Sequence, residues 1–442
     1  MVPHLIPWMG SALEIGRNPD TFFNRAQRKY GDVFAVKAFG RDIAFVVSPS
    51  LTSEVHRKAQ KYDFGYYRVT LTTECFAVPA RPVLKRIHSI DTLDVLTVFC
   101  FSLMKSDPLS KVLRPAHHRH LSPTGIGPTI EFYTTAVWDL LEKEGSRFAG
   151  VSTPLRDLVL PVLYQSSAYA FFGRSCPVLE SYQAFNDIDT DFHLLFAGVP
   201  RIFLRKSTEG VATMNRLFEK YFDGPHEEAS EYVLESERMI RDQGYDSKAV
   251  GAYLVCFFFA LMTNAPNAGY WMIILNLKRE EGLQPLVNEI DEAVASWKHQ
   301  NPGQGIEDHL YGFVSTVELP LLTSTIQETL RYVTSSVSIR RVTEPVELGG
   351  YRFDEGDEVA CMTRSVHLDE EIHKEVSEYN PRRFRCVQEA RALTSFMVSL
   401  LVRYTLEIDS KCSERPMFML ERVGTSALQP RGDIRIILHA RK

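Results

Sequence analysis

The stretch TSTIQETLRYV, residues 323–333, and the stretch SIRRVTEPVELGGYRFDEGDEVACMTRSVHLDEEIHKEVSEYNPRRF, residues 338–384, carry most of the information on the fold. The first predicts a helix in which Glu328 and Arg331 lie three residues apart on one face, where a carboxylate and a guanidinium can meet. Such a pair alone is usually a solvated contact worth at most about 1 kcal/mol. The second stretch adds a fixed order: an arginine, a hairpin, Gly-Asp, a strand, His-x-Asp and Pro-x-Arg-Phe. Because of this order, an isolated surface contact is the weaker interpretation of Glu328 and Arg331.

Short strands flank a long helical region. Apolar residues recur at spacings of three and four from about residue 129 to 333, which predicts helices. No repeat, low-complexity tract or long linker divides the chain, so we expect a single domain over residues 1–442 with a mainly α fold and small β regions. The β-rich part is expected in three places: about residues 30–50, where strands Val33 to Ala38 and Ile43 to Val47 flank Gly40, about 340–364 and about 418–442.

Composition excludes some partners. The chain of 442 residues has 50 lysines and arginines against 55 aspartates and glutamates, a net charge of -5. Nucleic-acid binding needs a clustered basic surface, so we expect no nucleic-acid partner. The 7 cysteines include no CxxC pair, which favours a reduced compartment, no disulfide and no zinc site. We expect a monomer.

The longest apolar segments do not predict a membrane anchor. Residues 1–16, MVPHLIPWMGSALEIG, lack the cationic start of a secretory signal and are interrupted by prolines. We interpret them as a hinge with a peripheral membrane contact, in a cytoplasmic protein, or one on the endoplasmic-reticulum surface if an N-terminal anchor has been removed. The apolar run 253–277 has Thr263, Asn264 and Pro266 at its centre, where a bilayer would leave polar groups unmatched. We predict a buried core helix there.

The order of features after residue 323 resembles the cytochrome P-450 family. The opening IPWMGSALEIGRNPDTFFNRAQRKYGDVFAVKAFGR, residues 6–41, looks like the proline hinge, first helix and first strands of such an enzyme. Residues 171–200 and 257–277 are similar to the subgroup that contains prostacyclin synthase and sterol 12α-hydroxylase, and to its fungal members. The resemblance covers nearly the whole chain and implies a cytochrome P-450-like fold. It also implies a structural Glu-Arg-Arg triad formed by Glu328, Arg331 and Arg383.

The chain departs from the family at the haem ligand. The family places Phe-x-x-Gly-x-x-x-Cys-x-Gly before the helix that FMVSLLVRY, residues 396–404, resembles, because a cysteine thiolate on a rigid turn must face the haem iron. Only residues 385–395 remain here, too short a segment for the usual connection and the ligand turn. Cys386 lies in it without the surrounding glycines. We therefore expect no haem and no metal, and Cys386 is a ligand only in the alternative in which haem is retained.

Other features associated with haem are also missing. Asn264 and Ala265 stand where oxygen-activating members carry an acid and an alcohol, although prostacyclin synthase-like members lack that pair too. No Trp-x-x-x-Arg precedes residues 121–133, where the family often holds a haem propionate. Arg340 matches the family's propionate-binding arginine. An unpaired buried guanidinium costs several kcal/mol, so we expect a partner for Arg340: a protein carboxylate, or the carboxylate or carbonyl of a substrate.

The remaining candidates are polar residues in apolar surroundings. HHRH, residues 117–120, is interpreted as a solvated loop or helix start, because only His117 and His120 share a helical side and no acidic ligand is near in sequence. The resemblance implies that six further residues line a substrate chamber: Thr263, Tyr270, Ser336, Ser338, Thr425 and Ser426.

A P-450-like shell without iron cannot activate oxygen, because that chemistry belongs to the cofactor. The leading hypothesis is a cofactor-independent cyclase or isomerase, for example a pericyclic enzyme of Diels–Alder type, acting on an apolar terpenoid or polyketide in fungal secondary metabolism. Arg340 or Asn264 would donate a hydrogen bond to a small apolar substrate bearing a carboxylate or carbonyl. Two alternatives stay open: a non-catalytic ligand-binding pseudoenzyme, and a haem-thiolate monooxygenase or peroxide isomerase with an atypical ligand.

Overall fold

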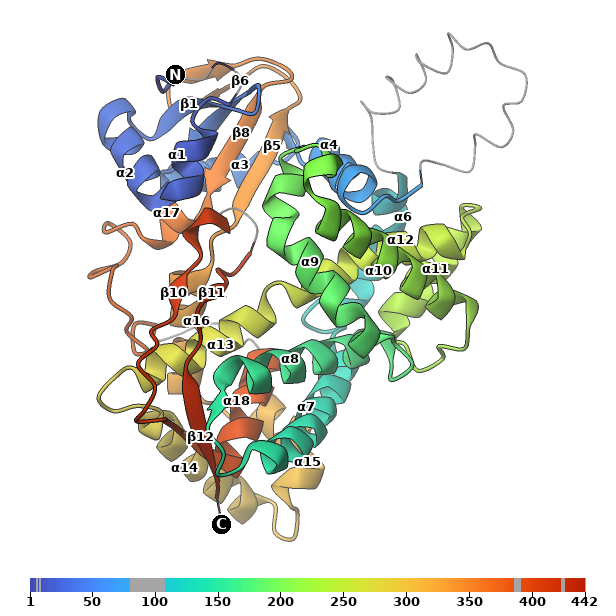
Figure 1. Ribbon diagram of the computed structural model, residues 1–442, viewed down its shortest axis with the longest axis vertical. Helices are drawn as coiled ribbons and strands as arrows, with labels where there is room; N and C mark the ends of the chain where they lie inside the picture. The colour runs from blue at the N-terminus through green and yellow to red at the C-terminus, as the bar shows by residue number, and fades with distance from the viewer. Residues whose placement is uncertain (5–6, 8, 80–107, 385–390, 423–425, 442) are drawn as a thin grey trace.

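The computed structural model describes residues 1–4, 7, 9–79, 108–384, 391–422 and 426–441. Two regions make up the molecule (Figure 1): a sheet with its covering helices near the N-terminus, and a larger helical region that reaches the C-terminus. The fold is mainly α with small sheets, which confirms the predicted class.

The larger sheet joins strands from distant parts of the chain in the order β1-β2-β8-β5-β3. Phe39 and Gly40, the turn between β1 and β2, have φ angles of 51° and 77°. Positive φ at both central residues is what a tight two-residue hairpin of type I′ requires. The parallel pairing of β2 with β8 closes the sheet only after the helical region has been traversed. Its strands are β1 (Val33–Ala38), β2 (Arg41–Val46), β3 (Tyr62–Asp63), β5 (Val337–Val342) and β8 (Glu358–Met362).

Helices α1 (Ala12–Arg17) and α2 (Pro19–Tyr30) lie against this sheet. Helix α2 begins after Asn18, whose side chain accepts a backbone hydrogen bond of 3.0 Å from the first turn. Its apolar side packs on the strands, and the ring centres of Phe23 and Phe45 lie 4.9 Å apart. The N-terminal region therefore has a small aromatic core of its own.

The helical region contains the long helices that the apolar periodicity predicts. It begins before residue 129, the expected start, because α6 precedes it. The bounds are α6 (Pro108–His120), α7 (Gly127–Phe148), α8 (Leu155–Phe172), α9 (Val178–Phe196), α10 (Arg205–Asp223), α11 (Glu231–Asp242), α12 (Ser247–Met262), α13 (Ala265–Leu277), α14 (Gln284–Gln300), α15 (Ile306–Thr316), α16 (Pro320–Val333) and α18 (Arg391–Arg403). Shorter elements connect them: α3 (Pro49–Arg57), α4 (Gly65–Thr70), η1 (Leu71–Cys75), η3 (Arg201–Phe203), β6 (Val346–Leu348), β7 (Tyr351–Phe353), α17 (Thr363–His367), β10 (Met417–Phe418), η4 (Leu420–Arg422) and β11 (Pro430–Arg431).

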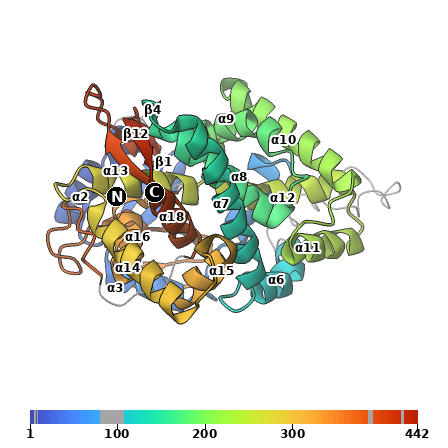
Figure 2. The ribbon, with the colours of Figure 1, turned by 90° about the horizontal axis from the view of Figure 1, so that it is seen from below.

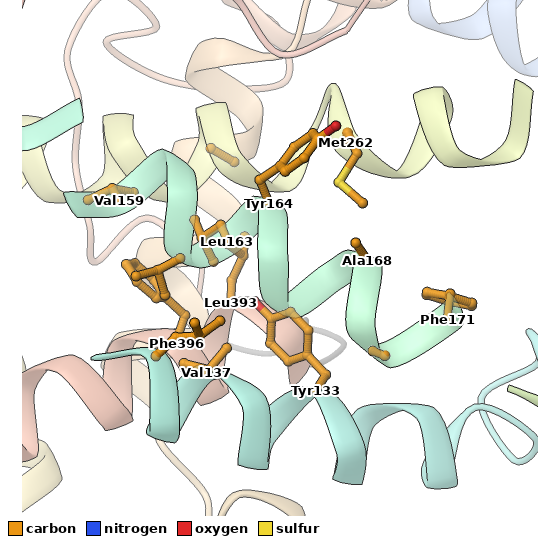
Figure 3. Packing of buried hydrophobic residues seen from close by; sticks show 14 of the residues in the cluster. Tyr133, Val137, Val159, Leu163, Tyr164, Ala168, Phe171, Met262, Leu393 and Phe396 are labelled. Atoms are coloured by element: carbon orange, nitrogen blue, oxygen red, sulfur yellow. The ribbon is translucent and has the colours of Figure 1, made fainter. Parts of the chain in front are cut away.

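The main core lies where α7, α8, α12 and α18 meet (Figure 3). Tyr133, Tyr164, Met262 and Phe396 point into it from these four helices and are 3%, 2%, 1% and 0% exposed. Large side chains from four helices thus fill one apolar volume, and burial of this kind is the main favourable term in folding. The helices of the core come from both halves of the chain, so the core ties α18 to the first long helices.

The C-terminal strand belongs to a second sheet at the far end of the helical region. Strands β4 (Thr153–Pro154), β12 (Arg435–Ala440) and β9 (Tyr404–Ile408) pair in the order β4-β12-β9. Figure 2 views the molecule from this end and shows α7, α14 and α18 around it. Grouping residues 418–442 with the N-terminal strands was therefore wrong for β12. Its alternate apolar residues Ile436 and Leu438 are fully buried in the helical core.

The central helix is interrupted between α12 and α13 at Thr263 and Asn264. Together the two helices form Ser247–Leu277, the one stretch of the described chain that is long and apolar enough to cross a membrane by length and composition. Within its most apolar window, 67% of the residues are buried inside the protein. This burial agrees with the predicted core helix.

Glu328, Arg331 and Arg383 meet as the resemblance implies. Arg331 donates from Nε and Nη2 to the Glu328 carboxylate at 2.7 and 2.8 Å, and Arg383 donates from Nε at 3.0 Å. The Asn380 amide donates to the same carboxylate at 2.8 Å. The Glu328 side chain is 0% exposed. The triad therefore fixes α16 to the segment that leads to α18.

Replacing Glu328 should strongly destabilise the fold. Glu328→Gln leaves the buried guanidinium of Arg331 and the half-buried one of Arg383 without a counter-charge, and breaking a buried pair in this way costs about 3–5 kcal/mol. We expect a loss of that size in the free energy of unfolding measured with urea. The matched control is Glu231→Gln, which removes an exposed contact to Arg238 and should cost at most about 1 kcal/mol. Equal losses in the two variants would contradict the assignment.

Stability should also fall in mild acid because of His367 at the end of α17. Burial, His373 and Arg331 lower the pKa of His367 to about 4. Its pKa in the unfolded chain is about 6.5, so the unfolded state binds more protons between these values and stability falls as pH falls. Between pH 7 and pH 5 this histidine should account for a loss of about 2 kcal/mol.

Urea unfolding at the two pH values checks this expectation. In His367→Gln the pH-dependent loss should shrink by about that amount, whereas His118→Gln, at an exposed histidine, should keep the wild-type dependence. An unchanged dependence in His367→Gln would show that His367 does not titrate as described.

Candidate functional site

An apolar chamber of about 560 Å³ lies between the larger sheet, α1 and the C-terminal end of α9. Its volume is within the range of about 300–1,000 Å³ that small-molecule sites occupy. Successive side chains of a strand point to opposite faces of a sheet, and the residues that line the chamber alternate accordingly. They are Ile43 and Phe45 of β2, Val337 and Ile339 of β5, and Ala360 and Met362 of β8.

The opposite wall and the rim come from two helices and a short turn. Leu13 and Ile15 of α1 and Leu194 and Phe196 of α9 provide the apolar part. The charged or titratable side chains that line the chamber are Arg17, Arg41, His193 and Glu421.

Arg41 of β2 makes hydrogen bonds that connect neighbouring segments beside the chamber. Its Nε donates to Glu358 at 2.9 Å, and its Nη2 donates to the hydroxyl of Tyr67 at 3.1 Å. Burial, followed by the effect of Glu358, raises the pKa of Tyr67, so that hydroxyl stays neutral. Arg41 is therefore hydrogen-bonded within the protein.

Arg340 does not line the chamber, because it points to the face of β5 opposite to Ile339. Its Nη1 donates to the carbonyl of Ile339 at 2.8 Å, and its guanidinium carbon lies 5.0 Å from the ring centre of Phe64. Within the described ranges it has no carboxylate partner at ion-pair distance. Burial lowers the pKa of Arg340, while Cys361 and Asp63 act in the opposite direction. That Arg340 donates a hydrogen bond to a ligand stays a prediction, and the ligand would have to lie on the face of β5 away from the chamber.

Asn264 lies at the break in the central helix and is exposed. Its Oδ1 accepts a hydrogen bond of 3.3 Å from the amide of Ala427, and its Nδ2 donates to the carbonyl of Ala260 at 3.3 Å. Thr263 is buried and donates to the same carbonyl at 3.4 Å. The break is thereby connected to the C-terminal segment, and substrate contact by these two residues stays a prediction.

The other residues expected to bind substrate make internal contacts. The Tyr270 hydroxyl is buried and donates to Asp433 at 2.7 Å. Ser338 is half-buried on the same face of β5 as Arg340. Ser336 donates to Thr363 at 3.2 Å, Ser426 donates to the carbonyl of Ala427 at 3.3 Å, and Thr425 lies outside the described residues. The structure brings none of the described four into the wall of the chamber.

The HHRH cluster ends α6 and packs against α11. His120 bonds through Nε2 to Glu235 at 2.6 Å, and Arg119 donates to the same carboxylate at 2.6 Å. Tyr232 of α11 bonds to His117 at 3.2 Å. The expected helix start is a helix end, and α11 supplies an acidic partner that is distant in sequence, whereas His117, His118 and Arg119 are exposed as expected. Over the part of the chain that the structure describes, no group of three or more His, Cys, Asp or Glu side chains could hold a metal ion.

Two of the described thiols are buried and protonated at neutral pH. Burial raises the pKa of Cys361 to about 11 and that of Cys75 to about 12. Cys386 lies outside the described residues. Helix α18 begins at Arg391, so residues 384–390 alone connect it to the triad.

The chain is similar in sequence and in structure to known proteins. The sequence profile described as Cytochrome P450 matches residues 1–79 and 150–399. The chain belongs to the cytochrome P450 family. Both matched ranges include residues of the chamber wall, and the second also includes the triad.

Curated relatives of this P450 chain are similar over most of their length. Cytochrome P450 7B1 of Mus musculus is 24% identical, covering 88% of this chain and 74% of the relative. Prostacyclin synthase of Rattus norvegicus is 22% identical, covering 98% and 91%. Cytochrome P450 monooxygenase poxD of Penicillium oxalicum is 22% identical, covering 87% and 76%. Cytochromes are haem proteins, so these names support haem as the alternative cofactor.

A solved structure supports the fold alone. Retinoic acid bound cyanobacterial CYP120A1 aligns with a TM-score of 0.70 and 14% sequence identity, covering 99% of this chain and 98% of that one. The resemblance seen in the sequence is thus confirmed for family and fold.

Sequence reasoning did not find His193 or the chamber wall. His193 lies in a helix that reads as amphipathic, DFHLLF, where a single histidine gives no signal of its own. The alternation of Val337 and Ile339 with polar residues in β5 was the available signal, because it marks one face of the sheet.

Proposed function

We propose that this chain is a haem-free member of the P450 family that acts as a cofactor-independent cyclase or isomerase. The reaction would be pericyclic, of Diels–Alder type, on an apolar terpenoid or polyketide of fungal secondary metabolism. The observation that carries the proposal is the short connection of residues 384–390 between Arg383 of the triad and Arg391, the first residue of α18. The family's ligand pattern is longer than this connection. A relative from Penicillium oxalicum supports the fungal setting.

The chamber supports chemistry that depends on shape. Holding a flexible apolar molecule in a reactive conformer can lower a barrier by about 7–11 kcal/mol through proximity and orientation. One directed hydrogen bond to a polarised carbonyl can add about 3 kcal/mol. Arg340 and Asn264 remain the proposed donors for a substrate that extends beyond the chamber. The same chamber would suit a non-catalytic binding protein. Such a protein would differ from the proposed enzyme because it binds the ligand without converting it.

A peripheral membrane contact is part of the proposal. Leu13 of α1 is 54% exposed, and Ile202 and Phe203 of η3 are 76% exposed each. Leu13 lines the chamber, and η3 follows α9, whose last residues line it too. We place a monomer with this side against the endoplasmic-reticulum surface, where an apolar substrate is dissolved, rather than free in the cytoplasm.

A second candidate function is that of a haem-thiolate monooxygenase or peroxide isomerase. It is favoured by the names of the relatives and by Arg340, a half-buried cation without a carboxylate partner among the described residues. Arg340 could hold an anionic group such as a propionate, and Cys386 would be the iron ligand. The cofactor would supply the oxidative chemistry.

Haem content separates these candidates. We expect the protein, produced with a haem precursor in the medium, to be colourless and folded, because the connection before α18 is shorter than the family's ligand pattern. Absorption spectra and porphyrin extraction check this, with the poxD relative produced in parallel as a positive control. Cys386→Ser should leave the spectrum unchanged. Stoichiometric haem that is lost in Cys386→Ser would refute the haem-free proposal.

Filling the chamber should reduce activity. Leu194→Trp adds a large side chain to the wall, and overpacking of this kind costs about 1–3 kcal/mol, so turnover of linear terpenoid or polyketide precursors should fall at least about tenfold. Product formation above the uncatalysed rate is followed by liquid chromatography and mass spectrometry. The matched control is Leu179→Trp on the same helix, where the side chain is 71% exposed. Ligand binding without turnover in the wild type would favour the pseudoenzyme.

A further inference from the structure

His193 has unused hydrogen-bonding capacity in the chamber wall. It lies on α9, lines the chamber, and its buried Nδ1 has no hydrogen-bond partner among the described residues. Within the same residues, no side chain or backbone group bonds to Nε2 either. A neutral imidazole offers one donor and one acceptor. Because protein atoms enclose Nδ1, Nε2 is the nitrogen that can meet a molecule in the chamber, and it donates or accepts according to the tautomer.

The groups around His193 keep the ring uncharged at neutral pH. Burial and then Arg422 lower the pKa of His193, whereas Asp191 and Glu421 act in the opposite direction. Arg422 is held by an ion pair of 2.9 Å to Asp189, and both side chains are 4% exposed. A positive charge on the imidazole would face this buried guanidinium. The neutral ring is the form that a ligand meets.

The other charged side chains of the chamber wall either have partners within the protein or are exposed at the rim of the chamber. Arg41 is bonded to Glu358, and Glu421 forms an ion pair with Arg431. Arg17 is exposed to solvent. His193 is therefore the side chain best placed to bond a ligand held inside the chamber.

We propose that His193 binds the polar group of the part of the ligand held inside the chamber, and that this group is neutral: a hydroxyl or a carbonyl on an otherwise apolar segment. The inference rests on the proposed function in one respect, that the chamber is the ligand site. A neutral imidazole donates to a carbonyl or accepts from a hydroxyl, whereas an ionised carboxylate would lose its hydration without gaining a counter-charge from the ring. The substrate class narrows to apolar alcohols, aldehydes and ketones.

Binding of isoprenoid probes with different head groups tests this assignment. The probes are geranylgeraniol, geranylgeranic acid and the matching hydrocarbon, each displacing the neutral fluorescent dye N-phenyl-1-naphthylamine at pH 7. A neutral hydrogen bond should make the alcohol bind about 3- to 10-fold more tightly than the hydrocarbon. The acid should bind no more tightly than the alcohol.

Variants assign the preference to the ring. His193→Phe should remove the preference for the alcohol and leave binding of the hydrocarbon unchanged, because shape is retained while both nitrogens are lost. His193→Gln should keep part of it. His118→Phe, at an exposed histidine of α6, is the matched control and should bind all probes as the wild type does. Thermal unfolding midpoints show that each variant is folded.

The outcomes separate this inference from the proposed function. If the wild type binds the alcohol and the hydrocarbon equally, the role of His193 is refuted while the chamber remains a ligand site. If the acid binds most tightly and still does so in His193→Phe, a cation at the rim selects the ligand and the inference is again overturned. If no probe displaces the dye and Leu194→Trp leaves dye binding unchanged, the chamber is not the ligand site and both proposals fall.

Discussion

A buried carboxylate, that of Glu328, holds the fold together at the point where the chain turns back into the helical core. It accepts hydrogen bonds from Arg331, Arg383 and the amide of Asn380. A buried charge is tolerated only when its remaining lone pairs are satisfied, and here two guanidinium groups and one amide satisfy them. Arg331 also donates to the carbonyls of His367 and Val376. The same charge network therefore fixes the backbone that leads to α18.

The pleat of β5 separates two environments. Val337 and Ile339 face the apolar chamber, and Ser338 and Arg340 face the other side, where Arg340 rests on a ring of Phe64. A shift of one residue in register would exchange these faces and expose the apolar pair. The antiparallel register with β8 prevents this, because Ile339 pairs with Ala360, another chamber residue. Chamber shape and the position of Arg340 thus depend on one strand pairing.

The sequence predicted features whose cause is local, or whose order along the chain is distinctive. Helix periodicity predicted α16, and its three-residue spacing placed Glu328 beside Arg331. Features that depend on distant segments were not predictable. Glu235 reaches His120 from another helix, and the chamber wall combines α1, α9 and three strands. Polar residues such as Tyr270 were assigned to substrate because they match family segments that line the substrate chamber, whereas the fold gives Tyr270 an internal partner in Asp433.

The position of the chamber explains how a chain of this family could exchange one kind of chemistry for another. Among the described residues, its walls come mainly from α1, α9, β2, β5 and β8. The triad, which precedes the connection of residues 384–390, is satisfied by protein groups alone. Under the proposed function, loss of an iron ligand between Arg383 and α18 would therefore leave the described chamber wall and the hydrogen bonds of the triad in place. The described chamber wall and the triad belong to elements other than that connection, so the proposed loss of the iron site would leave ligand binding and fold stability in place.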